Sequence, residues 1–361
     1  MINFTVGPVQ MDKETRALEK NQIPYFRTPE FSATMKENEK IMCSFFDAPK
    51  NSKCVFMTGS GTASMEASVM NFFSTKDKVL VVNGGTFGER LVELCTIHEI
   101  PFTEIKLEYG TPLTKEMLEK YAGKKYTGMM LQLCETSTGI LYDMKMVGQF
   151  CKENNLFLMV DAVSGFLADK FSMKRMNVNV AITGSQKALS LPPGLSFIVC
   201  DETAQTRCIN NKVKSMYFDL KDYFKNGERG QTPFTPAVGT LLMLNEKLNR
   251  MVKEGGVTVQ NQKAKERAEY FRNSIKHLPL KMFTKPKNSS NAVTALMPAN
   301  KNISAYDIFT EIKDKYGIWV CPNGGDMRDK IFRVGHIGCI SKEEIDKLVK
   351  AFDSLVKKGK L

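Results

Sequence analysis

The sequence predicts an α/β fold, with a mostly parallel sheet covered by helices on both faces in a large domain and a smaller α+β domain after it. Short apolar runs alternate with helical stretches between about residues 50 and 200, which is typical of repeated strand–helix units. Strands buried on both faces read as continuous apolar runs. We expect them at Val55, 79–82, 102–107, 129–133, 156–160, 180–183 and 197–199.

The rest of the chain is assigned by composition. Residues 216–236 are irregular and rich in Gly and Pro, which predicts a loop near the site. A helix is expected at about 236–251, before the glycines at 255 and 256. A chain of 361 residues should hold about two domains. We expect an N-terminal segment at 1–20 that joins the small domain, a large cofactor-binding domain at 21–250, and a small α+β domain at 251–361.

Composition narrows the class of protein. Apolar residues make up 42% of the chain, yet no apolar run approaches the ~18 residues of a membrane span. The first residues do not read as a secretory signal. Nine cysteines without a C-x-x-C pair suit free thiols in a reducing cytoplasm, and with only three histidines no metal site is expected.

The formal net charge is +12. It could steer anionic substrates, or it could indicate nucleic-acid binding. The lysines spread along the whole chain, however, and no RNA-binding motif is visible. A solvated lysine-rich surface is therefore the favoured interpretation, with no nucleic-acid or membrane partner.

One lysine lies in a polar turn between two predicted strands. Gly184-Ser185-Gln186-Lys187 follows the run at 180–183, and the run at 197–199 comes soon afterwards. A lysine held between strands cannot easily extend to solvent, and desolvation lowers the pKa of its ammonium group. Its neutral amine can attack an aldehyde to form a Schiff base, so Lys187 is a candidate nucleophile.

A carboxylate strengthens that hypothesis. Asp161 ends the run at 156–160, on the strand end that faces the ligand crevice in open α/β sheets. A lone aspartate there is more often a helix cap, but Lys187 follows 26 residues later, about one strand–helix–strand step. This pair suits pyridoxal 5'-phosphate, whose aldehyde takes a lysine and whose ring nitrogen needs a carboxylate partner.

A turn of small residues offers a place for the cofactor's phosphate. Thr58-Gly59-Ser60-Gly61-Thr62 joins an expected strand at 54–57 to a helix at 63–73. Free N–H groups at a helix start favour an anion, and the hydroxyls of Ser60 and Thr62 add donors. The turn fits neither the dinucleotide-binding nor the P-loop pattern.

A substrate carboxylate needs a cation. Arg333 lies in the apolar run Ile331-Phe332-Arg333-Val334, so it requires an anionic partner or an exit to water. A guanidinium pairs bidentately with a planar carboxylate, although Arg333 could also be an edge-strand surface residue. Gly7-Pro8 predicts a tight turn whose backbone can approach a substrate.

Taken in order, these motifs resemble the class V, fold-type I pyridoxal-phosphate aminotransferases, in particular the alanine–glyoxylate and serine–glyoxylate branch. The resemblance runs almost end to end. It is carried by residues 5–8, 26–31, 58–67, 83–90, 135–139, 161–164, 184–187, 232–236 and 332–338.

The resemblance implies roles at the cofactor ring. Lys187 would carry the Schiff base and move the substrate proton, and Asp161 would pair with the ring nitrogen. Val163 would pack on one ring face. Phe87 would stack on the other, where many relatives carry tryptophan or tyrosine.

The resemblance also implies the remaining contacts. The phosphate would be held by Ser60, Gly61, Thr62 and Gln186, and Thr136 would lie by the ring oxygen or the substrate. Thr235 would reach the same phosphate from a neighbouring subunit, which makes the active site a property of a homodimer. Gly7 and Arg333 would bind the substrate, while Arg27 would meet a second anionic group or serve only as a structural ion-pair partner.

The activity implied is transamination from serine or alanine to glyoxylate or pyruvate, in a ping-pong Schiff-base mechanism. The alternative in the same class is a 2-aminoethylphosphonate–pyruvate transaminase. A cysteine desulfurase-type lyase is less expected, because Gln186 rather than a histidine precedes Lys187 and because Cys321 and Cys339 can be ordinary thiols. A cofactor-free binding protein is disfavoured, because the lysine, aspartate and arginine are all present.

Overall fold

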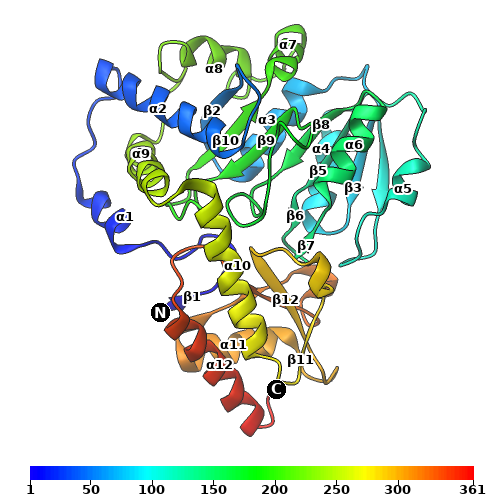
Figure 1. Ribbon diagram of the computed structural model, residues 1–361, viewed down its shortest axis with the longest axis vertical. Coiled ribbons are helices and arrows are strands. Elements are labelled where there is room, and N and C mark those ends of the chain that lie inside the picture. Colours follow the sequence, from blue (N-terminus) through cyan, green and yellow to red (C-terminus); the bar gives the residue numbers. More distant parts are fainter.

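The computed structural model describes residues 1–361 and is built around two sheets (Figure 1). The larger sheet has seven strands, in the order β2-β10-β9-β8-β5-β3-β4. Its strands are β2 (Lys53–Thr58), β3 (Val79–Asn83), β4 (Phe102–Lys106), β5 (Gly128–Gln132), β8 (Phe157–Asp161), β9 (Val180–Gly184) and β10 (Leu195–Cys200). All seven expected strands are present, so the α/β prediction is confirmed.

The sheet is mostly parallel, as predicted, with one exception. β10 runs antiparallel to both of its neighbours, β2 and β9. Only residues 185–194 join β9 to β10, and no helix lies among them. A parallel return needs a crossover of a dozen residues or more, so this short link reverses the strand. The turn with Lys187 lies in this link.

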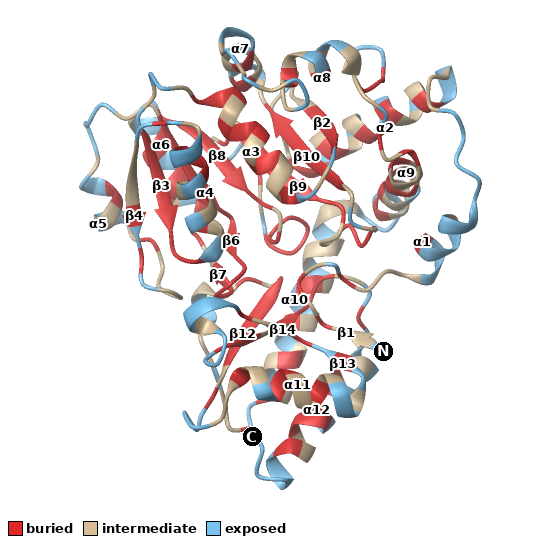
Figure 2. Ribbon diagram, turned by 180° about the vertical axis from the view of Figure 1, so that it is seen from behind, coloured by how far each residue is buried: buried red, intermediate tan, exposed pale blue.

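Helices cover both faces of the sheet, as the pattern of the runs predicts. In β3, Leu80 and Val82 join one apolar cluster while Val79 and Val81 join another on the opposite face. The strands are accordingly buried along most of their length, except for the edge strand β4 (Figure 2). The first cluster is completed by α2 (Pro29–Phe45), α6 (Met144–Glu153) and α9 (Val238–Lys253), and the second by α3 (Gly61–Phe72), α4 (Thr86–Ile97), α7 (Glu202–Asn210) and α8 (Leu220–Gly227).

Helix α8 corrects one expectation, because residues 216–236 are not a continuous loop. The carboxylate of Asp219 caps the helix by accepting a hydrogen bond from the backbone of Lys221. Leu220 and Tyr223, three residues apart, are buried on one side. These cap and spacing signals were outweighed by the Gly and Pro content of the segment. Helix α9 matches its expected range to within two residues.

The smaller sheet is antiparallel and has the order β11-β12-β15-β14. These strands are β11 (Leu280–Met282), β12 (Val293–Pro298), β14 (Cys321–Pro322) and β15 (Phe332–Gly335). The chain start pairs with this part of the molecule, because β1 (Ile2–Asn3) lies parallel to β13 (Ile318–Trp319). The expected domain boundaries at residues 20 and 250 stay predictions.

Helix α10 (Gly256–Ser274) runs from the larger sheet towards the smaller one (Figure 1). The remaining elements are α1 (Lys13–Ala17), α5 (Lys115–Glu119), α11 (Ala305–Tyr316), α12 (Lys342–Lys357), β6 (Cys134–Glu135), β7 (Ile140–Leu141), and the 3-10 turns η1 (Leu18–Lys20), η2 (Pro286–Asn288) and η3 (Gly325–Met327). None of the helices is both long and apolar enough to cross a membrane.

Candidate active site

The predicted lysine and aspartate come together at the carboxyl ends of the central strands. Asp161 is the last residue of β8, paired in register with Ile182 of β9, and Lys187 follows β9 in the turn to β10. Parallel strands present their carboxyl ends at one edge, where open α/β sheets bind ligands. The two charges are close enough for each to act on the pKa of the other.

The N-terminal segment covers the stem of Lys187. A Cβ on Gly7 would lie 2.8 Å from both Cδ and Cε of Lys187, so no larger residue fits at position 7. The backbone N–H of Val9 donates to the carbonyl of Gln186 over 3.1 Å. This cover explains why burial lowers the pKa of the Lys187 ammonium, although Asp161 acts in the opposite direction.

Asp161 is almost fully buried, with 5% of its surface exposed. Burial raises the pKa of its carboxyl to about 6, and the hydrogen bond that it accepts from the backbone of Val163 over 2.9 Å opposes this rise. A buried carboxylate with one backbone donor favours a further cationic or N–H partner.

The small-residue turn opens helix α3, as predicted. Ser60 is the residue before the helix, and its hydroxyl makes no capping hydrogen bond. A Cβ on Gly61 would lie 3.1 Å from Cγ2 of Val163, so Val163 packs against the helix start. The hydroxyl of Thr62 accepts a hydrogen bond from Nη1 of Arg90 over 3.0 Å. The turn therefore has free N–H groups and a free hydroxyl for an anion.

Sequence reasoning missed the role of Glu135, which is fully buried at the end of β6. Its Oε2 accepts from the backbones of Phe87 and Gly88 at 3.1 and 3.0 Å, and its Oε1 accepts from the backbone and hydroxyl of Ser137 at 3.0 and 2.6 Å. Burial raises the pKa of Glu135 while these donors lower it. Glu135 thus fixes the first turn of α4, which carries Phe87.

A second residue that the sequence did not reveal is Arg90, whose guanidinium lies 5.0 Å from the centre of the Phe87 ring. Arg90 contacts both Phe87 and Thr62. It therefore links the residue expected to stack on the cofactor ring to a residue expected to bind the phosphate.

Arg333 is held in β15 with part of its guanidinium free. Nη1 donates to the carbonyl of Thr136 over 3.3 Å, and Nη2 donates to the carbonyl of Pro322 over 2.7 Å. Nε is buried and has no hydrogen-bond partner. An unpaired buried N–H of a cation costs free energy, which an anionic ligand would recover.

A cavity of about 910 Å³ opens beside Arg333 and Phe87. Its other charged lining residues are Glu89, Lys106, Glu108 and Asp326. Thr136 is also buried here, and its hydroxyl is 2.5 Å from that of Ser164. The lining residues therefore come both from the carboxyl edge of the larger sheet and from the region of the smaller sheet.

Of the expected site residues, only Phe87 and Arg333 line this cavity. Arg27 and Thr235 are among those that do not. Arg27 donates to the side chain of Gln231 and to the carbonyls of Thr232 and Pro233, at 3.3, 3.0 and 3.4 Å, and it makes no ion pair. Thr235 is exposed in the same segment. Arg27 therefore positions the loop segment 231–233, which leads to Thr235.

The chain matches a known family along most of its length. Residues 21–327 match the aminotransferase class-V family. The chain belongs to this family. It is therefore an aminotransferase, as the sequence motifs predict.

The relatives support this assignment under several names. The chain is 31% identical over 334 residues to the soluble hydrogenase 42 kDa subunit of Anabaena cylindrica, covering 91% of this chain and 86% of that protein. It is 30% identical to an uncharacterized aminotransferase of Methanocaldococcus jannaschii, with 94% and 88% covered. It is 28% identical to the 2-aminoethylphosphonate–pyruvate transaminase of Pseudomonas aeruginosa, with 82% and 81% covered.

Solved structures share the fold. The ureidoglycine–glyoxylate aminotransferase of Bacillus subtilis superposes with a TM-score of 0.92 at 23% identity, covering 99% of this chain and 92% of that one. The alanine–glyoxylate aminotransferase of Nostoc sp. gives 0.91 at 22% identity, with 99% and 96% covered. These likenesses confirm the fold-type I architecture predicted above.

The family implies pyridoxal 5'-phosphate, and the residues present fit it. Lys187 and Asp161 are buried together, and the Ser60 hydroxyl is free at a helix start. Each of these groups matches a different part of the cofactor. No group of three or more His, Cys, Asp or Glu side chains is placed to hold a metal ion.

Proposed function

We propose that this class-V aminotransferase moves the amino group of serine or alanine to glyoxylate or pyruvate in a ping-pong reaction. The observation that carries the proposal is the free Nε of Arg333 beside the 910 Å³ cavity. Together with Nη2, Nε forms the side of the guanidinium that pairs with a planar carboxylate. Every one of these substrates has such a carboxylate.

Pyridoxal 5'-phosphate would supply an electron sink for negative charge at the substrate α-carbon. Lys187 would hold the cofactor and then move a proton at the α-carbon. The low pKa that burial imposes on Lys187 supports this, because a neutral amine can act as a base. Asp161 would pair with the ring nitrogen, and that cation would stabilise its buried carboxylate.

The other chain residues would orient the ring and the phosphate. Val163 packs at the start of α3, and Phe87 is fixed by Glu135 at the start of α4, which supports their placement on the two ring faces. Ser60, Gly61, Thr62 and Gln186 would hold the phosphate, and Gly7 and Thr136 would lie beside the substrate.

The charges of the cavity lining support a donor with one anionic group. Besides Arg333 and Lys106, the lining has three carboxylates, on Glu89, Glu108 and Asp326. A second anionic group would meet these carboxylates. Arg27 is already engaged with residues 231–233, so we propose a structural role for it rather than a second substrate contact.

The second candidate donor is 2-aminoethylphosphonate. It is favoured by the 28% identical Pseudomonas aeruginosa relative that carries this name. Its phosphonate could also pair with Arg333, but a dianion is the less suitable neighbour for three carboxylates. The desulfurase alternative has weaker support, because Gln186 rather than a histidine precedes Lys187, although the half-buried Cys321 on strand β14 is close enough to Lys187 to act on its pKa.

We also propose that the active enzyme is a homodimer in which Thr235 reaches the phosphate of the other subunit. Thr235 is exposed, and the ring of its neighbour Phe234 stacks on Tyr217 at 5.0 Å. Met216 and Tyr217 are 79% and 38% exposed, which is unusual for large apolar side chains. A partner subunit on this segment would bury them.

The test is a spectral titration of the cofactor-loaded enzyme with single amino donors and no acceptor. The donors are L-serine, L-alanine, L-aspartate and 2-aminoethylphosphonate. Serine or alanine should convert the visible absorbance band to that of the aminated cofactor. Conversion by 2-aminoethylphosphonate alone would replace the proposed donors with the second candidate, and conversion by none of the four would overturn both.

A further inference from the structure

A second cavity lies beside the turn that carries Lys187, and its lining shares no residue with that of the proposed substrate cavity. It has a volume of about 210 Å³. Ala188 and Ser190 line it from the lysine turn, and Gly338 and Cys339 line it from the segment that follows β15. Most of its remaining wall comes from α9 and α10, with Asp12 and Glu14 near the chain start. None of the residues proposed for transamination lines it.

Most of the charged groups in this second cavity are paired with one another. Asp12 forms ion pairs with Lys247 and Arg250, and these contacts hold the pKa of Asp12 well below its usual range against the effect of burial. Lys263 pairs with Glu254 over 2.6 Å. These side chains therefore need no ligand.

Arg267 is the exception. It is the one cation of this lining with no carboxylate within 4 Å. Its Nη1 donates to the carbonyls of His336 and Gly338 over 3.3 and 2.9 Å, while Nε and Nη2 donate to no protein atom. The Arg267 side chain is partly buried, and this burial lowers the pKa of its guanidinium.

The free edge of Arg267 defines the chemistry of a ligand. Nε and Nη2 are the two nitrogens on the side of a guanidinium, and their parallel N–H bonds match the two oxygens of a carboxylate. The volume suits a small molecule, since one water occupies ~30 Å³ of liquid. We propose that this cavity is a second binding site, separate from the active site, for a small organic carboxylate held bidentately by Arg267.

The position of the site gives it a connection to the active site. On one side is Ser190, whose backbone N–H donates to the carbonyl of Lys187 over 2.8 Å. On the other are the carbonyls of His336 and Gly338, three and five residues after Arg333. A bound carboxylate would restrain both segments at once. The proposal itself rests on Arg267 and the cavity, and it does not depend on the substrate of the transaminase.

Cys339 provides a readout inside the cavity. Among the nine cysteines, all of them free, it is the exposed one. The holoenzyme is treated with a limiting amount of iodoacetamide, and alkylation of Cys339 is followed by peptide mass spectrometry. Malonate is the carboxylate tested, and chloride at matched ionic strength is the control. Malonate at about ten times its Kd should slow alkylation of Cys339 about tenfold, with a saturable dependence on concentration.

Three variants locate the binding group. Arg267→Gln should abolish the protection. Arg267→Lys, which keeps the charge but lacks the two parallel N–H donors, should weaken it. Lys263→Gln removes a cation of the same cavity that is already paired, so its protection should stay within about twofold of wild type. Arg333→Gln should keep the protection, because the proposed active-site clamp is not involved.

Several results would overturn the proposal. The proposal fails if malonate does not slow the alkylation of Cys339 or if chloride slows it equally. It also fails if Lys263→Gln loses as much protection as Arg267→Gln, or if Arg333→Gln loses protection. Equal protection by sulfate would overturn the assignment to carboxylates. Thermal melts of each variant show whether it is folded, and the comparison of malonate, chloride and sulfate on the wild-type enzyme tests the proposal even where a variant does not fold.

Discussion

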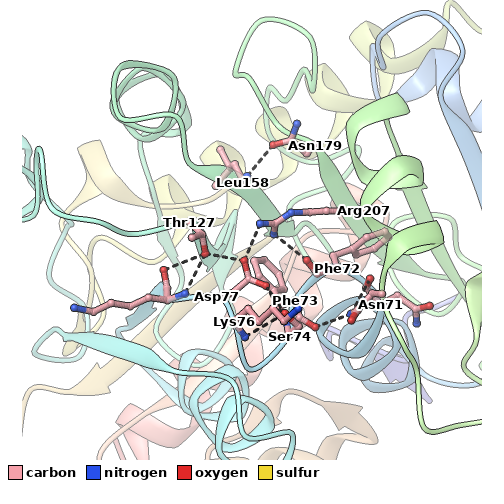
Figure 3. A network of polar contacts seen from close by, with 12 residues as sticks. Asn71, Phe72, Phe73, Ser74, Lys76, Asp77, Thr127, Leu158, Asn179 and Arg207 are labelled. Carbon is pink, nitrogen blue, oxygen red and sulfur yellow. Dashed lines mark hydrogen bonds and ion pairs between the residues drawn. The ribbon is translucent and has the colours of Figure 1, made fainter.

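The two ends of the larger sheet contain similar kinds of side chain, but they differ in how completely those side chains are paired. At the amino ends of the strands, Arg207 donates to Asp77 over 2.7 Å and to the carbonyl of Phe72 over 2.9 Å. Thr127 donates to the same carboxylate over 2.8 Å, and Asn179 accepts from the backbone of Leu158 (Figure 3). Each polar group in this network has a partner within the chain.

At the carboxyl ends, the pairing is incomplete. Oε1 of Gln186 is buried without a partner, and Asp161 has a raised pKa. Nε of Arg333, on strand β15 of the smaller sheet beside this edge, is also buried and unpaired. Buried polar groups are nearly always paired in stable proteins, so the incomplete end is the one that needs a ligand. Charge and burial alone do not distinguish the two ends, whereas the number of unpaired groups does.

The largest expected effect is the loss of turnover in Lys187→Ala. Removing the base should lower kcat by about 10⁴-fold or more, while the phosphate turn still binds some cofactor. Transamination is measured by production of the oxo acid under cofactor saturation. Near-normal steady-state activity would show that Lys187 is not needed for the reaction. It would then contradict the assignment of the active site to the carboxyl edge of the sheet.

Arg333→Gln should act on binding more than on chemistry. Losing the carboxylate clamp should raise KM about 100-fold for donor and acceptor alike, because an unpaired substrate carboxylate costs several kcal/mol. Steady-state kinetics with each substrate varied in turn give this value. Lys106→Gln, in the same cavity lining, is the matched control and should change KM far less. An unchanged KM for both substrates in Arg333→Gln would place the clamp elsewhere.

Asp161→Asn should separate function from stability. In the folded cofactor-free protein the Asp161 pKa is raised from 3.8 to about 6, so the fold binds this proton more tightly than the unfolded chain does. Stability is therefore lost as the pH rises through this window, by roughly 3 kcal/mol at most. The asparagine variant should lose activity, yet its denaturant midpoint should fall less between pH 4 and 7. A steeper fall than in wild type would contradict this account.

Arg207→Met should show the opposite pattern at the paired end of the sheet. It leaves Asp77 without its cation, and breaking such a pair should cost roughly 2 kcal/mol, less than for a fully buried pair because the Arg207 side chain is 28% exposed. Urea melts give the loss, with kcat per folded molecule unchanged. Lys115→Met, which breaks an exposed pair with Glu119, should cost under about 0.5 kcal/mol. A large loss of kcat in Arg207→Met would show that the two ends are coupled.

The sequence predicted the parts of this molecule that depend on local pattern. Six of the seven strands contain continuous apolar runs, with β4 the exception, and Lys187 and Asp161 stand in motifs at strand ends. Two features of the fold were not predicted from the sequence. The reversal of β10 follows from the length of a link, and helix α8 depends on buried positions within a segment rich in Gly and Pro.

The sequence yielded the residues that we propose for the site, but only some of the contacts among them. Glu135 was quoted in a motif without a role, although it follows the buried run at 129–133 much as Asp161 follows its own run. The same rule about strand ends would have found it. The partners of Arg27 could not be foreseen, because they are backbone carbonyls about 200 residues away in the chain.

The most direct test of the central claim is to identify the lysine that holds the cofactor. The protein loaded with pyridoxal 5'-phosphate is reduced with borohydride, digested and mapped by mass spectrometry. The account predicts the phosphopyridoxyl mass on the peptide that contains Lys187, with its visible absorbance lost on reduction, and no such mass in Lys187→Ala. An adduct confined to another lysine, or no adduct in a protein that still transaminates, would contradict it.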